Sequence, residues 1–299
     1  MAPHTPMFLV ALVVDGALAG VIYALIGLGF VVVYKASRVI NFALGEWLML
    51  GALLVAVGVY RLAFGLPGAL LAACVGMIAF AALFNHLVLR RLVGRPVVSV
   101  IMVTLGLGAV MRGAVSVAFR GIPGGVALPV PQRVVEVAGL YLSTDKLVAG
   151  AIAAIAVAAI TAVFRWSRAG LALRAIADDD RAAMAAGIDV QHHLAIAWGT
   201  LGVLSVLAGT LWTSVASGGV GLVIVGLKVF PVVVIGGLDS IPATIVAALL
   251  VGILESVMAG YVDPLVGGGF SGVAAFILVI LVLFTRPHGL LGGAAIRRV

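Results

Sequence analysis

The chain alternates between long apolar segments and short polar ones. At ~1.5 Å of rise per residue, an apolar helix of ~20 residues crosses the ~30 Å hydrocarbon layer of a bilayer. The pattern therefore predicts an all-α membrane protein, a polytopic helical bundle of eight or nine transmembrane helices that forms a single domain over residues 1–299. The apolar segments are residues 7–34, 43–60, 66–89, 97–119, 147–164, 194–216, 221–238, 241–261 and 267–285.

The segment at 221–238 decides between eight and nine crossings. It contains Gly226, Lys228 and Pro231, which can interrupt a helix. A re-entrant or broken helix is tolerated at membrane depth only where protein or a cavity covers the freed backbone groups. A full crossing and a re-entrant segment both stay open from the sequence.

Composition removes the soluble classes of protein. Hydrophobic residues make up 64% of the chain and charged residues 10%, with a mean hydropathy of +1.31, whereas soluble domains carry about a quarter charged residues. The net charge of +7 does not indicate a nucleic-acid partner, because the basic residues occur singly or in small groups between apolar segments. Membrane lipid is the expected surrounding. Since no Lys or Arg precedes Lys35, the first segment is expected to be a retained span and not a cleaved signal peptide.

The positions of the basic residues predict the orientation. With nine crossings and the N-terminus outside, twelve of the 18 Lys and Arg residues fall on the inner side and four on the outer side. The positive-inside rule therefore selects an outer N-terminus and an inner C-terminus. In this arrangement the outer loop at 120–146 contains three prolines, and it is expected to be turn-rich and to face a soluble partner.

One inner segment, RAIADDDRAAMAAGIDV at 174–190, holds an unusual concentration of charge. Asp178 has the side chain of an N-cap, and Asp179 and Asp180 suit the positive end of a helix dipole. Gly187 can take the left-handed conformation that ends a helix. The sequence predicts a short helix over residues 181–186.

Such a short helix is not stable in water by itself and must dock on something. Its small residues, Ala182 and Ala183 among them, permit close approach by another protein. Packing on its own bundle and contact with lipid headgroups are equally open alternatives. The residues expected to form this surface are Arg174, Asp178, Asp179, Asp180, Arg181, Ala182, Ala183 and Gly187.

This charged segment resembles the coupling-helix region of permease subunits from ATP-binding cassette importers of the branched-chain amino acid family. Three further stretches resemble motifs of the same family. They are INFALGEWLMLGA at 40–52, GLKVF at 226–230 and VIGGLDSIPATIVAALLVGILE at 234–255. The sequence departs from those motifs at Leu44, where the family usually has His, at Val229, which replaces Ala, and at Asp239, Ala243, Ala247 and Ala248, which replace glycines.

The resemblance implies a permease subunit of the bacterial inner membrane, with a cytoplasmic coupling-helix loop at about 165–193. It implies as partners a second permease subunit, which is a paralogue or an identical copy, two cytoplasmic ATPase subunits and an external solute-binding protein. The chain has no phosphate-binding G-x-x-x-x-G-K-[ST] loop. ATP and Mg are therefore expected on the ATPases, and this chain is expected to hold no cofactor or metal and to be no enzyme. Branched-chain amino acids are the expected cargo, with urea, short amides and other amino acids as alternatives.

Ionisable and amide side chains inside apolar segments are costly and face a cavity or a partner. Asn41 and Glu46 could line the substrate pathway or brace the start of a helix. Lys228 could attract a carboxylate, pair with Glu255 in a structural ion pair, or extend to the membrane surface. Arg112 could extend outward in the same way.

Small residues predict close contacts between helices. Gly16 and Gly20 have small-xxx-small spacing, and TLGLGAVMRG at 104–113 contains three glycines with the same expected role. Asp15 is expected near the outer surface.

Two other classes of protein can be weighed against this interpretation. An ion-coupled secondary transporter would carry symmetric repeats and buried carboxylates, and the chain offers Glu255 and little else. GFSG at 269–272 matches a motif of intramembrane serine proteases, but Ser271 is expected at the outer end of its span, whereas His86 and His288 are expected near the inner side.

Overall fold

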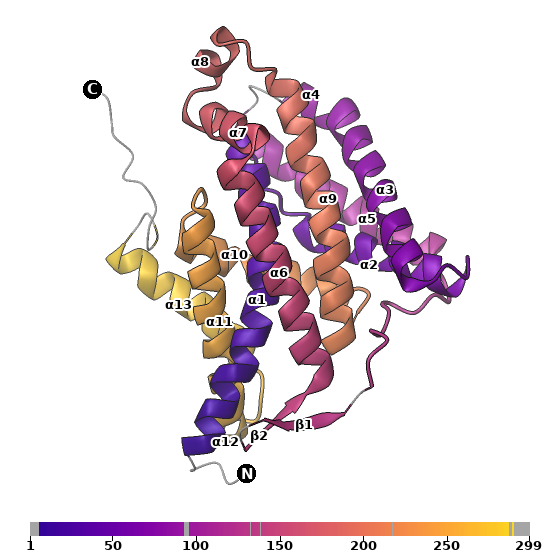
Figure 1. Cartoon of the computed structure of the whole chain (residues 1–299). Helices are drawn as coiled ribbons and strands as arrows, with labels where there is room; N and C mark the ends of the chain where they lie inside the picture. The colour runs from indigo at the N-terminus through magenta and orange to yellow at the C-terminus, as the bar shows by residue number, and fades with distance from the viewer. Residues whose placement is uncertain are drawn as a thin grey trace. The chain divides into compact units, whose positions relative to one another are not determined.

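The computed structural model describes residues 6–92, 96–131, 133–137, 139–216, 218–286 and 289 (Figure 1). The chain divides into two compact units. Unit 1 comprises residues 1–31, 129–157 and 228–299, and unit 2 comprises residues 32–128 and 158–227. Several long helices run from one unit into the other. The prediction of a single domain stays a prediction.

All nine apolar segments of the sequence form helices, as predicted. Six of these helices are long and apolar enough to cross a membrane: α1 (Pro6–Ser37), α3 with its continuation (Leu66–Leu92), α5 (Val97–Ala118), α6 (Thr144–Trp166), α9 (Val190–Val215) and α11 (Ile241–Tyr261). The continuation of α3 (Leu66–Phe84) consists of the π-helix η1 (Asn85–Leu89) and α4 (Arg90–Leu92). Three apolar helices are shorter: α2 (Leu44–Tyr60), α10 (Gly221–Gly236) and α13 (Phe270–Thr285). The number of crossings and the outer N-terminus remain predictions.

A short β-hairpin is the departure from the all-α prediction within the described residues. Strand β1 (Val134–Val137) pairs antiparallel with β2 (Leu140–Ser143), and Glu136 lies opposite Tyr141. The sequence predicted only a turn-rich loop here. Valine and tyrosine favour strands, and Gly139 has a φ of +81° that suits a tight turn between them.

The core of unit 2 is a cluster of aromatic side chains between closely packed helices. The Trp47 ring lies 5.0 Å from that of Phe80 and 5.5 Å from that of Trp198, measured between centroids. Glycines let the helices approach. A Cβ built on Gly51 of α2 would lie 2.8 Å from the backbone nitrogen of Val206 in α9, which is shorter than any real carbon contact.

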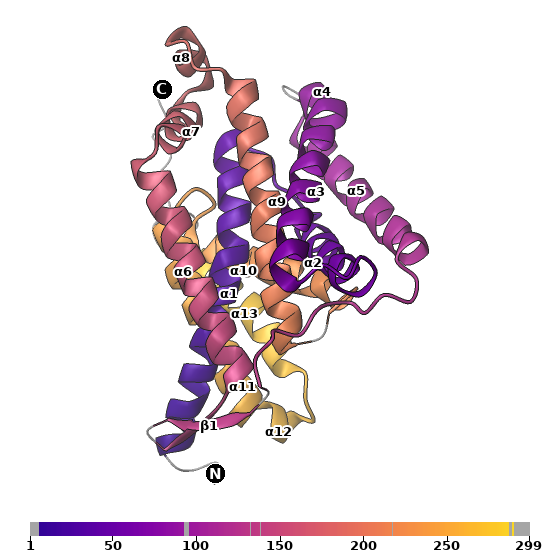
Figure 2. The same cartoon turned by 45° about the vertical axis from the view of Figure 1, so that its right-hand side comes forward.

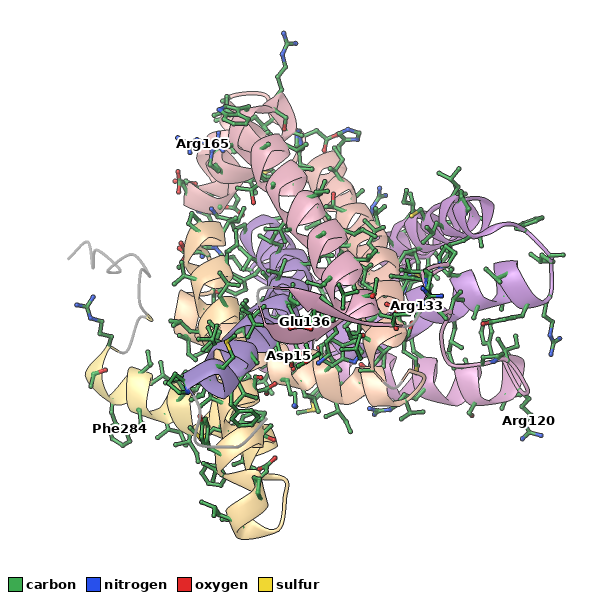
Figure 3. The ribbon with its side chains drawn as sticks, turned by 60° about the horizontal axis from the view of Figure 1, so that its bottom comes forward. Asp15, Arg120, Arg133, Glu136, Arg165 and Phe284 are labelled. Carbon is green, nitrogen blue, oxygen red and sulfur yellow. The ribbon has the colours of Figure 1, made fainter. Side chains whose placement is uncertain are left out.

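Unit 1 is held by an equally close contact between α1 and α11. A Cβ on Gly16 would lie 2.6 Å from the carbonyl oxygen of Gly252, and one on Gly20 would lie 2.8 Å from that of Ala248. The prediction of close helix contact is confirmed for Gly16 and Gly20. It is wrong for Gly106 and Gly113 of the 104–113 stretch, where an added Cβ would meet no described atom within 4 Å. In contrast, α13 is exposed along most of its length and ends near Phe284, which is 85% exposed and points away from the helix (Figure 3).

The glycine contacts of unit 1 give a testable prediction. We expect Gly252→Ala to destabilise the fold by about 1–3 kcal/mol, because the added methyl group would overlap the backbone of α1. Thermal unfolding of the purified protein measures the change. Gly106→Ala is the matched control, since a Cβ there meets no described atom within 4 Å. Equal melting temperatures for both variants would contradict the packing argument.

Candidate functional site

The charged segment forms two short helices between α6 and α9. Helix α7 (Arg168–Asp178) follows α6 at once, and α8 (Asp180–Ala185) precedes α9 (Figures 1 and 2). Each start is capped by a side chain. The Ser167 hydroxyl accepts a hydrogen bond from the Gly170 nitrogen at 3.0 Å, and one Asp179 carboxylate oxygen accepts bonds from the nitrogens of Arg181 and Ala182 at 2.9 and 3.0 Å. These caps fix where each helix begins.

The predicted N-cap of the short helix is wrong by one residue. Asp178 is the last residue of α7, Asp179 is the cap, and α8 begins at Asp180. The end is as predicted: Gly187 has a φ of +84°, and the Ile188 nitrogen donates to the Ala183 carbonyl, which is the Schellman pattern. Helix α7 itself was missed, although Ser167 is a typical N-cap.

Helix α7 folds back against the end of α6. The Arg174 guanidinium donates to the carbonyl oxygens of Phe164 and Arg165, which have no further helical partner at the end of α6. Gly170 lies directly on the Phe164 backbone, where a Cβ would collide. Arg174 thus braces α7 against α6, and its predicted place in a docking surface stays a prediction.

Helix α8 is exposed at every residue except Ala183. Ala183 is 4% exposed and anchors the helix, while Arg181, Ala182 and Met184 are exposed. The carboxylates of Asp178 and Asp180 are also exposed and have no hydrogen-bond or ion-pair partner among the described residues. Arg174 and Ala183 therefore support the element from within. Asp178 and Asp180 are on its exposed surface, and their carboxylates have no partner in the part of the chain that the structure describes.

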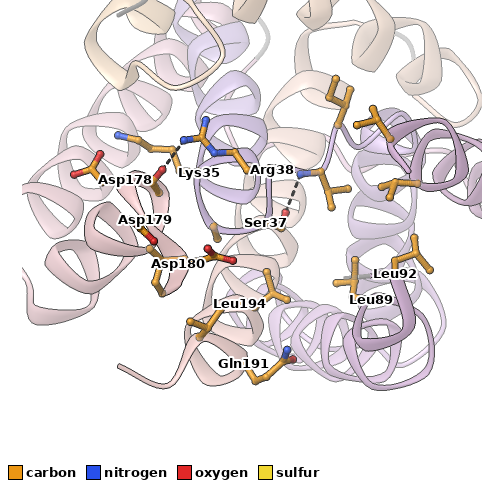
Figure 4. A pocket seen from close by; sticks show the side chains of 18 of the residues that line it. Lys35, Ser37, Arg38, Leu89, Leu92, Asp178, Asp179, Asp180, Gln191 and Leu194 are labelled. Atoms are coloured by element: carbon orange, nitrogen blue, oxygen red, sulfur yellow. Dashed lines mark hydrogen bonds between the residues drawn. The ribbon is translucent and has the colours of Figure 1, made fainter. Parts of the chain in front are cut away.

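A cavity of about 590 Å³ lies beside this element, within unit 2. Its polar rim comes from the end of α1 and from α7 and α8, and its apolar wall comes from α4, α5 and α9 (Figure 4). Movement of α7 and α8 would therefore change the shape of the space beneath them.

Glu46 and Arg112 form an ion pair inside unit 2. The Arg112 Nη1 lies 2.8 Å from Glu46 Oε1, and Glu46 is 3% exposed. Gly108, one turn before Arg112, provides the room: a Cβ there would lie 3.0 Å from the Glu46 carboxyl carbon. Arg112 thus reaches a carboxylate on a neighbouring helix, while 44% of its side chain stays exposed.

Asn41 lies in the turn before α2 and is 1% exposed. Its side-chain oxygen accepts a hydrogen bond from the Ala43 nitrogen at 3.0 Å, so it braces the turn. Its amide nitrogen has no partner among the described residues. A role of Asn41 and Glu46 in the substrate pathway stays a prediction.

Lys228 and Glu255 meet inside unit 1. The Lys228 ammonium lies 3.3 Å from Glu255 Oε1, and the Tyr23 hydroxyl donates to Glu255 Oε2 at 2.7 Å. The structural ion pair left open by the sequence is therefore present. Each predicted pair thus lies in its own unit, with Asn41 and Glu46 in unit 2 and Lys228 and Glu255 in unit 1.

Two of the motif stretches pack on each other. Gly45 of the 40–52 stretch and Gly226 of the 226–230 stretch lie so close that a Cβ on Gly226 would collide with the Gly45 backbone. The third stretch covers the end of α10, the turn that follows and most of α11; in the turn, Gly237 has a φ of +93° and Ser240 caps α11. These glycines are required by close approach and by backbone conformation.

Ser271 has a structural role in this fold. Its hydroxyl and its backbone nitrogen donate to the two carboxylate oxygens of Asp263, at 2.7 and 2.9 Å, between the short helix α12 (Asp263–Val266) and α13. These hydrogen bonds hold the pKa of Asp263 below its usual value. The bonds connect the two helices.

Comparison with known proteins identifies the family of the chain. Residues 12–284 match the model of a family described as the permease component of the branched-chain amino acid transport system. The chain belongs to this permease family. It is a multi-pass membrane transport protein of the kind found in the bacterial inner membrane, and not an enzyme.

The sequence similarity to individual relatives extends over nearly the full length of the chain. The high-affinity branched-chain amino acid transport system permease protein LivH of Escherichia coli is 29% identical, with 95% of this chain and 96% of LivH covered. BraD of Pseudomonas aeruginosa, with the same description, is 28% identical over 96% of each chain. The solved structure of PsaBC from Streptococcus pneumoniae in complex with Fab is 16% identical, with a TM-score of 0.49 and 95% and 94% of the two chains covered.

The cap of α8 can be tested directly. We expect Asp179→Ala to weaken the permease's α8 by about 1 kcal/mol, because the nitrogens of Arg181 and Ala182 lose their acceptor. Faster hydrogen exchange at these two amides measures the loss. Asp178→Ala is the matched control and should leave both amides unchanged; the reverse result would support the cap predicted from sequence.

The ion pair of unit 2 gives a second prediction. Arg112→Ala should destabilise the permease by about 1–3 kcal/mol, because it leaves the buried Glu46 carboxylate without its cation. Adding Glu46→Gln removes the charge and should recover part of the loss. Thermal unfolding of the two variants in nanodiscs decides the point, and an Arg112→Ala protein as stable as the wild type would show that the pair contributes nothing.

Proposed function

We propose that this permease is the membrane subunit of an ATP-binding cassette importer that carries branched-chain amino acids into the cell. The family match over residues 12–284 supports the transport class. The full-length similarity to LivH and BraD, whose names give branched-chain amino acids, supports the cargo.

ATP is hydrolysed on separate subunits in this proposal. The sequence has no phosphate-binding loop, so two cytoplasmic ATPases with ATP and Mg supply the energy. Helices α7 and α8 are the docking element. The observation that carries this assignment is that α8 is short and capped, with Arg181, Ala182 and Met184 exposed. A helix of this length is stable only when it packs against another part of a protein.

The other partners follow from the same scheme. A second permease subunit completes the membrane part, and an external solute-binding protein delivers the cargo. The N-terminus is outside and the C-terminus inside, so that α7 and α8 face the cytoplasm and the β-hairpin faces the side from which cargo arrives. The aliphatic cargo needs apolar walls with few polar anchors, which the apolar helices of the permease can provide.

Uptake by the reconstituted importer tests the proposal. Vesicles that contain the permease, its paralogue and the ATPases should accumulate labelled leucine only with ATP on the α8 side and the binding protein on the opposite side. Accumulation by the permease alone under an ion gradient would instead show a secondary transporter. Accumulation of urea or a short amide without leucine would overturn the cargo and leave the ATP-driven class intact.

The side of the membrane is tested separately. In a Cys74→Ala background, Ala182→Cys should react with an impermeant maleimide only after the membrane is opened. Tyr141→Cys on the exposed hairpin is the matched control and should react in intact cells. Labelling of residue 182 in intact cells would place α8 outside and contradict the docking assignment.

A further inference from the structure

Helix α1 ends in a conformation that a non-glycine residue rarely adopts. Arg38, the residue after α1, has a φ of +54°, in the left-handed region. For a non-glycine residue this conformation costs of order 1 kcal/mol or more and persists where its surroundings enforce it. Ser37 supports the turn, since its hydroxyl donates to the Val33 carbonyl and accepts from the Val39 nitrogen. The chain thus holds Arg38 in a strained position.

The strained backbone directs the Arg38 side chain at α7. Its guanidinium donates to the carbonyl oxygen of Ala177, in the last turn of α7 (Figure 4). Carbonyls at that end of a helix lack helical partners and carry the negative end of the dipole, so a cation is stabilised there. The guanidinium carbon also lies 5.7 Å from the centroid of the Tyr34 ring.

This contact is the second that an arginine side chain makes to connect α7 with a neighbouring helix. Arg174 ties α7 to the end of α6, and Arg38 ties the other end of α7 to α1, across 139 residues of sequence. Directly after Arg38 the chain leads through Asn41 into α2 and Glu46. A displacement of α7 and α8 is therefore passed to the end of α1 and the start of α2 through the Arg38 side chain.

We infer that Arg38 is a positioning residue that transmits movement of α7 and α8 to α1 and α2. The inference rests on the proposed function, in which ATPases move α8. Arg174 connects α7 to α6, which already continues into α7 through the backbone; Arg38 connects α7 to a segment far away in sequence. Without Arg38, the ATPases still bind α8, but their closure is no longer passed to α1, so ATP is hydrolysed with little transport.

Three variants separate the side chain from the backbone strain. Arg38→Gly removes the tether and relieves the strain, Arg38→Ala removes the tether and keeps the strain, and Arg38→Lys keeps a cation with a single donor group. The matched control is Arg61→Ala, because the Arg61 guanidinium also donates to a backbone carbonyl, that of Arg120, away from α7.

The first readout is leucine accumulated per ATP hydrolysed in vesicles with the complete importer. We expect this ratio to fall about tenfold in Arg38→Gly and Arg38→Ala, in keeping with a hydrogen bond from a charged group, and less in Arg38→Lys. ATPase co-purification should be unchanged in all of them, and Arg61→Ala should retain the wild-type ratio. A wild-type ratio in Arg38→Gly would overturn the inference, because the tether would then be dispensable.

The second readout does not depend on transport. Hydrogen exchange of residues 175–187 in the purified permease should be faster in Arg38→Gly than in the wild type and in Arg61→Ala. Unchanged exchange would overturn the tether even if transport fell. If the wild-type importer shows no ATP-driven uptake while exchange responds to Arg38→Gly, the proposed function fails and the structural tether stands, so the two failures are distinguishable.

Discussion

The fold depends on the close approach of helix backbones at small residues. In a bilayer, apolar side chains gain little by leaving lipid for protein, so van der Waals contact between backbones becomes a main source of helix association. Gly16, Gly20 and Gly252 provide it in unit 1, and Gly51 provides it in unit 2. Even an added methyl group would overlap the neighbouring backbone at these positions. The contacts therefore also fix which faces of the helices meet.

Polar groups are placed in the space that these contacts leave. Gly108 makes room for the Glu46 carboxylate, which then reaches Arg112, and the close packing of Gly45 and Gly226 holds the start of α2 against α10. Lys228 and Glu255 likewise neutralise each other in unit 1. A buried charge without a partner is costly, so such pairs stabilise the bundle before they contribute to any passage of cargo.

The sequence predicted the helices well and the partners of polar side chains less well. Hydrophobic runs require helices in a membrane, because only a helix satisfies its own backbone there. The partner of Arg112 could not be predicted, because a long side chain can extend to the surface or to a neighbour, and only the tertiary packing of α5 on α2 decides. The cap of α8 was misplaced by one residue because three consecutive aspartates are equally competent. The choice of Asp179 follows from the length of α7, and no local signal reports that length.

The positions of these aspartates also bear on the role proposed for Arg38, the transmission of movement from α7 and α8. Asp178, Asp179 and Asp180 stand beside Arg38 at the rim of the cavity, yet its guanidinium is bonded to the backbone carbonyl of Ala177. A backbone carbonyl, unlike the neighbouring carboxylates, carries no titratable proton. The hydrogen bond that it accepts from Arg38 is also directional. Asp179 is already used as the cap, whereas the carboxylates of Asp178 and Asp180 are exposed and have no partner among the described residues. In the proposed importer, binding of an ATPase to those carboxylates would leave the contact between Arg38 and the Ala177 carbonyl in place.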